Sequence, residues 1–121
     1  MAFVLNNSEH KKAEMELMES EEKFREVFNN AKDMISLNLY ENEGLPGKFI
    51  EVNEIGIDRL GYTYDQFLNM TPADIVAPDK RSEMGKNAIK LSENGHNEFE
   101  IVHQTKDGKR IPVEVNNHLL N

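Results

Sequence analysis

The chain has 121 residues, with 14 Lys and Arg against 22 Asp and Glu and a formal net charge of −8. This length suits one domain. The negative charge argues against a nucleic-acid binder, because it repels phosphate backbones. No run approaches the roughly 20 apolar residues of a membrane span. Cysteine is absent, which excludes disulfides, thiolate nucleophiles and Cys-ligated zinc. The start lacks a secretory signal, so we expect a cytoplasmic protein.

The N-terminal part predicts a helix over residues 8–31, because it contains no Pro or Gly and is rich in Glu and Lys. A polar interval predicts a break near Ser20. We therefore divide the chain into a helical lead-in (residues 1–21) and a main domain (residues 22–121). The apolar stripe of this helix either packs on its own domain or forms a short coiled coil in a homodimer. The candidate dimer-interface residues are Leu17, Phe24 and Phe28.

Two short strands and a helix come next. Residues 34–40 alternate between apolar and polar types, and residues 48–52 pair back with them after a turn that contains glycines and a proline. Asn53 is placed to cap a helix over residues 54–60, since its side chain accepts hydrogen bonds from the first-turn amides. Gly61 ends that helix in the left-handed conformation.

The second half predicts short helices and then a second hairpin. The helices are expected at residues 64–68, 73–76 and 79–92. The strands 96–105 and 110–119 follow, joined by a tight turn at Asp107-Gly108. This order predicts an α+β fold, with an antiparallel sheet and its short helices mainly on one face.

Several segments, in this order and at this spacing, resemble a PAS domain of the sensory-box type, as found in sensor histidine kinases. The resemblance covers residues 22–120. The matching segments are Phe24–Ala31, Asp33-Met34-Ile35, Val52-Asn53-Glu54, Leu60-Gly61-Tyr62-Thr63, Asp74-Ile75-Val76, Pro78-Asp79, Phe99-Glu100 and Lys106-Asp107-Gly108.

The resemblance implies a five-stranded antiparallel sheet of order 2-1-5-4-3 that cradles a small cavity beneath the helices. The family's last strand should follow Asn121, so the domain is expected to be truncated before it. That strand lies between the first and the fourth, whose edges would otherwise remain unpaired. We expect another chain, the N-terminal segment or an adjustment of the sheet to fill its place.

The candidate ligand pocket is the space between sheet and helices. Its polar candidates are His103 and Asn117, each in phase with apolar neighbours on its strand, where they would orient a carboxylate or carbonyl group. The alternatives are that the apolar residues pack as core and that the polar pair is solvated. The apolar candidates are Leu37, Ile57, Leu60, Phe67, Ile75, Ile89, Phe99, Ile101, Val113 and Val115.

No cofactor can be named from the sequence. Haem-binding relatives carry a histidine on or beside the long helix, whereas residues 79–92 contain none and His96 lies just past them. A flavin adduct of the LOV type needs a cysteine, which is missing. His96 and His118 should face each other across the second hairpin, but no third metal ligand is evident, so no metal site is predicted. No catalytic motif is present, and we predict no catalytic residue.

These observations predict an intracellular sensory module of a two-component signalling system. It would belong to a sensor histidine kinase, bind a small-molecule cue or a partner, and relay a conformational change. The alternative is a dimerisation or protein-docking module that binds no ligand.

Overall fold

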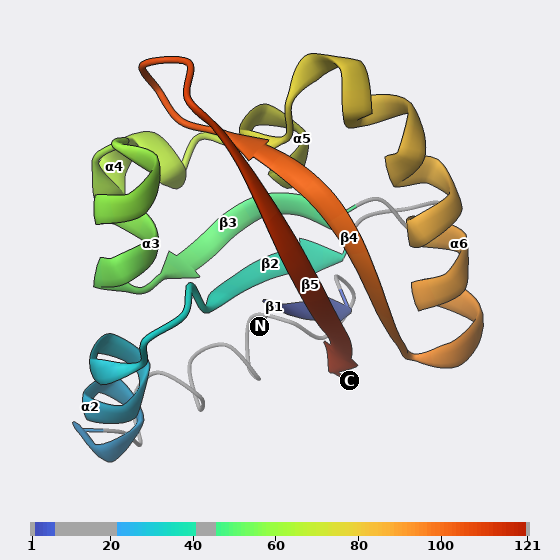
Figure 1. Ribbon diagram of the computed structural model, residues 1–121. Helices are drawn as coiled ribbons and strands as arrows, with labels where there is room; N and C mark the ends of the chain where they lie inside the picture. Colours follow the sequence, from blue (N-terminus) through green and yellow to red (C-terminus); the bar gives the residue numbers. More distant parts are fainter. Residues whose placement is uncertain (1, 7–21, 41–45, 121) are drawn as a thin grey trace.

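The computed structural model describes residues 2–6, 22–40 and 46–120, and it contains one five-stranded sheet with helices around it (Figure 1). The first half contains β1 (Ala2–Asn6), α2 (Glu22–Asn30), β2 (Ser36–Tyr40), β3 (Pro46–Val52), α3 (Glu54–Leu60), α4 (Tyr64–Phe67) and α5 (Pro72–Ile75). The second half contains the 3₁₀ helix η2 (Pro78–Glu83), α6 (Met84–Asn94), β4 (His96–Gln104) and β5 (Arg110–Leu120). The expected α+β class is confirmed.

The sheet has the strand order β3-β2-β1-β5-β4. Both predicted hairpins are present, because β2 pairs antiparallel with β3 and β4 pairs antiparallel with β5. The position between them is filled by β1, where Ala2 is the register partner of Ser36 on one side and of Asn117 on the other. The N-terminal segment, one of the three expected candidates, thus takes this place, and it pairs with all of β2 and with β5 from Asn117 to Leu120.

Two expectations about the N-terminal half need correction. The sheet is mixed rather than wholly antiparallel, because β1 runs parallel to both neighbours. Residues 2–6, assigned to the helical lead-in, form a strand because long-range pairing offers their backbone partners on both sides. Residues 7–21, with Leu17 and the expected break near Ser20, lie outside the described residues.

The short helices α3 and α4 begin at residues that cap their first turns, and α3 ends at a glycine in the left-handed conformation. Asn53 caps α3, and Gly61 ends it at φ 83°. Thr63 and Gln66 form a reciprocal capping box at α4. The helix predicted over residues 79–92 is divided, with η2 leading into α6 at Met84.

The apolar core lies between β3 and the helices α3 to α5. Phe49 and Phe67 meet edge to face with their ring centroids 5.3 Å apart, a favourable geometry for aromatic pairs. The buried members of this core are Phe49, Val52, Leu60, Phe67 and Ile75.

Asn53 connects this core to α2. Its side-chain amide nitrogen donates to the carbonyl oxygens of Phe28, at 2.8 Å, and Asp33, at 2.9 Å. Its side-chain oxygen accepts from the backbone N–H of Ile35 at 2.9 Å and of Gly56 at 3.3 Å. The residue is 0% exposed. One side chain therefore joins the end of α2, the segment before β2 and the start of α3.

We expect Asn53→Ala to lower the free energy of unfolding by about 3 kcal/mol, because buried backbone groups lose their partners. Asn53→Asp should also destabilise, since a carboxylate keeps the acceptor but loses both donors. Urea denaturation measures both effects. Asn69→Ala is the control: its amide donates to the Asp65 carbonyl at an exposed site, and we expect a change below about 0.5 kcal/mol. Equal effects at Asn53 and Asn69 would contradict the assignment.

Candidate functional site

A cavity of about 520 Å³ lies between the sheet and the helices α5 and α6. Its sheet side is formed by inward residues of β1, β2, β4 and β5, and its helix side mainly by α6. The lining residues from the sheet include Ala2, Val4, Ser36, Asn38, Phe99, Ile101, His103, Val113, Val115 and Asn117. Those from the helices include Ile75, Met84, Asn87, Ala88 and Leu91. The space is therefore mostly apolar with a few polar groups, as small-molecule sites are.

Seven of the twelve predicted pocket residues line this cavity. They come from α5 and from alternate positions of β4 and β5, so the predicted inward phase of the second hairpin agrees with the cavity. They are Ile75, Phe99, Ile101, His103, Val113, Val115 and Asn117.

The other five predicted residues lie elsewhere. Leu60 and Phe67 are buried in the apolar core, and Ile57 packs against it. Ile89 is 58% exposed on α6, whereas its neighbour Ala88 lines the cavity. Leu37 is buried on the other face of the sheet, because Ser36 and Asn38 on either side of it point into the cavity.

Leu37 on one face of β2 and Asn38 on the other are both buried, at 4% and 1% exposure. Glu51 on β3 is the register partner of Leu37, and its carboxylate accepts from the Arg25 guanidinium of α2 at 3.3 Å. Both faces of β2 are therefore buried. A strand buried on both faces gives no simple alternation signal for the inward side, and for this reason Asn38 was missed as a site residue.

Asparagines provide the main polar lining. Asn38 is 1% exposed; its oxygen accepts from the Ser36 hydroxyl, and its nitrogen donates to the Gly47 carbonyl, each at 3.2 Å. Asn117 pairs in register with Asn97 on β4. The Asn97 nitrogen donates to the carbonyl of Asn87 at 2.7 Å. The cavity thus offers uncharged polar groups at its wall.

His103 adds a titratable group to this wall. Burial, aided by the positive charge of Arg59, lowers the pKa of His103 from 6.5 to about 4. The imidazole is therefore neutral near pH 7, with one nitrogen as donor and the other as acceptor. The charged lining residues Asp33, Arg59 and Glu114 are all exposed, so charge lies at the solvent side of the cavity.

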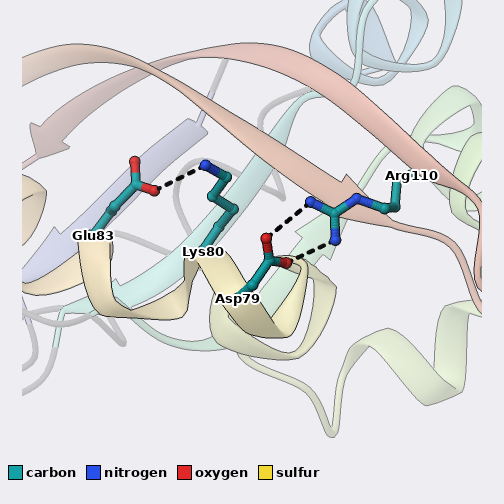
Figure 2. A network of polar contacts seen from close by, with 4 residues as sticks. All are labelled: Asp79, Lys80, Glu83 and Arg110. Atoms are coloured by element: carbon teal, nitrogen blue, oxygen red, sulfur yellow. Dashed lines mark hydrogen bonds and ion pairs between the residues drawn. The ribbon is translucent and has the colours of Figure 1, made fainter.

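An ion pair joins the helical cover of the cavity to the second hairpin (Figure 2). The Arg110 guanidinium at the start of β5 donates to both carboxylate oxygens of Asp79 on η2, at 2.7 and 3.1 Å. This bond holds the pKa of Asp79 below its usual value. Lys80 and Glu83 form a second pair within η2, at 3.6 Å. A bidentate contact fixes orientation as well as distance, so η2 keeps its position beside the hairpin.

The histidines of the second hairpin form a register pair. His96 and His118 face each other as predicted. Within residues 2–6, 22–40 and 46–120, no group of three or more His, Asp or Glu side chains is arranged to hold a metal ion. No helix in these same ranges is both long and apolar enough to cross a bilayer.

The shifted pKa of His103 predicts a pH dependence of stability. The unfolded chain binds a proton at this residue below pH 6.5, whereas the folded chain stays neutral down to about pH 4. The contribution of neutral His103 to the free energy of unfolding is thus complete above pH 6.5. It is lost as the pH falls from 6.5 to about 4. Between about pH 7 and 4.5, we expect wild-type stability to fall about 2 kcal/mol more than that of His103→Gln. Urea denaturation at both pH values checks this, and identical falls would refute it.

The comparisons with known proteins agree with this geometry. The PAS domain family model matches residues 39–118. The methyl sulfide methyltransferase-associated sensor of Methanosarcina acetivorans is 32% identical over 112 residues. That alignment covers 93% of this chain but 11% of the relative, so the chain spans only a small part of that protein's length.

Solved PAS structures share the fold. One is a domain of the sensory box sensor histidine kinase/response regulator from Geobacter sulfurreducens, with a TM-score of 0.66 and 22% identity over 80% of this chain and 81% of that one. Another is the PAS domain of an HTR-like protein from Haloarcula marismortui, with a TM-score of 0.63 and 23% identity over 88% and 84% of the two chains. With the family match over most of the chain, they lead to one conclusion: the chain belongs to the PAS domain family of sensory modules.

Proposed function

We propose that this PAS domain binds an uncharged small molecule of mixed polarity and serves as the sensory input of a sensor histidine kinase. The cavity of about 520 Å³ carries the proposal, because its walls combine apolar side chains with buried, uncharged polar ones. Asn38, Asn117 and the neutral His103 supply hydrogen-bond donors and acceptors. A charged ligand would lack a buried counter-charge there and would lose its hydration without compensation.

The signal would leave the cavity through β2 and β3 toward α2. Asn38 lines the cavity on one face of β2, and Leu37 on the other face is paired with Glu51, which bonds Arg25. A ligand shifts this arrangement only if it binds one position of the strands more tightly than another. The proposed output is therefore a change in how α2 is held against the sheet.

The proposed homodimer would use α2. Phe28, one predicted interface residue, is buried within its own chain, whereas Val27 is 69% exposed. The side chain of Phe24 is outside the described set, as is Leu17. Among the α2 side chains that the structure describes, Val27 is thus the exposed apolar residue available to a second copy. The proposed location is the cytoplasm, in keeping with the cysteine-free composition.

Ligand binding can be tested with a substitution that narrows the cavity. We expect native mass spectrometry to find a small molecule carried by the wild type from expression. We expect Ala88→Leu to reduce its occupancy at least tenfold while stability is kept, because the larger side chain fills empty space. Ile89→Phe, at the adjacent exposed position, should leave occupancy unchanged.

Two outcomes would contradict ligand binding in the cavity. If the wild type carries no small molecule and an NMR screen of uncharged amides, alcohols and ketones shifts no cavity resonance, the domain is not a small-molecule sensor. A ligand retained equally by Ala88→Leu would place the binding site outside the cavity.

The contact between α2 and the sheet gives a second prediction. Glu51 is buried. Partial burial of the Tyr64 phenol, and then the adjacent Glu51 carboxylate, raise the pKa of Tyr64 to about 12. Arg25→Gln leaves this carboxylate without its cation, so we expect a loss of about 1–2 kcal/mol in the free energy of unfolding and faster amide exchange in α2. Glu51→Gln removes the buried charge as well and should be milder. If Glu51→Gln is the more damaging change, this contact does not hold α2.

A further inference from the structure

One buried hydrogen-bond acceptor at the α6 end of the cavity has no donor. The side chain of Asn97, at the start of β4, is 7% exposed. Its nitrogen donates to the Asn87 carbonyl of α6 at 2.7 Å, and this bond fixes which side of the amide carries the oxygen. Among the side-chain polar atoms of residues 2–6, 22–40 and 46–120, the Asn97 oxygen is the one that is buried without a hydrogen-bond partner. An acceptor removed from water in this way costs free energy until a donor reaches it.

Asn97 lies on the inward face of the sheet. It is in phase along β4 with Phe99 and Ile101, and both of these residues line the cavity. Its register partner on β5 is Asn117, which also lines the cavity. The Cβ atoms of two residues opposed in this way are about 5 Å apart. Because Asn87 lines the cavity as well, the unpaired oxygen lies beside two residues that a bound molecule would contact.

A ligand group can reach this oxygen by displacing one side chain. In the described part of the chain, the Asn117 side chain makes no hydrogen bond that would hold it in one rotamer. It can therefore turn about its side-chain bonds, and its amide remains available to a ligand in either position. The Asn97 amide, in contrast, is held by its bond to α6. The α6 end of the cavity thus combines one fixed acceptor with one adjustable amide.

We propose that Asn97 makes the cavity selective for ligands with a neutral hydrogen-bond donor, an amide N–H or a hydroxyl. The inference rests on the proposed function and adds what the bound molecule must carry. A donor at this position satisfies the Asn97 oxygen, whereas a ketone or an ether leaves it unpaired. Sites that bond a ligand donor discriminate strongly against analogues without it, because the protein group then stays buried without a partner. The Asn117 amide bonds the acceptor that accompanies such a donor.

The test compares lactams of one ring size by NMR titration of the full chain. δ-Valerolactam carries an amide N–H beside its carbonyl. An isomer methylated on a ring carbon keeps this N–H, whereas N-methyl-δ-valerolactam has the same size and lacks it. We expect the two N–H compounds to bind at least tenfold more tightly than the N-methyl compound. They should also shift the side-chain amide resonances of Asn97, because a bond to its oxygen polarises the attached N–H groups.

A substitution at Asn97 tests the source of this preference. Asn97→Leu replaces the amide with an apolar side chain, and we expect the preference for N–H compounds to fall below about twofold. Cyclohexanone lacks a donor and should bind the wild type and this variant equally. Asn94→Leu makes the same change at an exposed position of α6 and should keep the preference. The lactam comparison in the wild type stands even if Asn97→Leu does not fold.

The outcomes separate this inference from the proposed function. If N-methyl-δ-valerolactam binds as tightly as its ring-methylated isomer, or if no lactam shifts the Asn97 amide, the inference is overturned. Binding of cyclohexanone in the cavity would then leave the ligand-binding function intact. If neither the lactams nor cyclohexanone binds and the wild type carries no molecule from expression, both fail. A water molecule that keeps the Asn97 oxygen in a crystal structure of the δ-valerolactam complex would also overturn the inference.

Discussion

The arrangement of the whole domain depends on the buried amide of Asn53. Both halves of this amide are used, and each half makes two hydrogen bonds to the backbone. The groups it contacts belong to the end of α2, the segment before β2 and the first turn of α3. No other side-chain type of this size offers two donors and two acceptors in fixed directions. One residue therefore ties together the end of α2, the segment before β2 and the start of α3.

This constraint explains how the two faces of the sheet differ. On the outer face, α2 is held through Asn53 and through the Arg25–Glu51 pair. On the inner face, the core fills the space beside β3, while the space beside β4 and β5 is left as the cavity. Of the strands that border the cavity, β2 pairs with β3, and β3 carries Glu51, the partner of Arg25 on α2. A change in strand position has a structural route to that helix.

Local signals predicted much of the fold. Some signals depend only on neighbouring residues: the cap at Asn53, the left-handed Gly61 and the Asp107-Gly108 turn. The helix α3 and the β4–β5 hairpin, which these signals delimit, are present as expected. The strand β1 could not be predicted in this way, because its pairing partners are distant in sequence. The division of the long helix at Met84 also had no clear local signal.

The sequence predicts site residues only where the alternation of apolar and polar residues shows which face of a strand points inward. The second hairpin has one outer face exposed to solvent, so its alternation predicted His103, Val113 and Asn117 as inward, and all three line the cavity. The pattern could not separate cavity from core, and Leu60 and Phe67 were assigned to the wrong side of that boundary because both environments are apolar. In β2, burial of both faces concealed the inward position of Asn38.

The central place of β1 has a consequence for biosynthesis. Its partner on one side is β5, whose pairing residues follow it by nearly the full length of the chain. A ribosome releases the first strand long before the last one exists, so the sheet closes only after translation has passed Leu120. Until then, the hairpin of β2 and β3 keeps an open edge. Contacts of such long sequence separation form slowly, and nascent chains of this domain depend on remaining soluble during that interval.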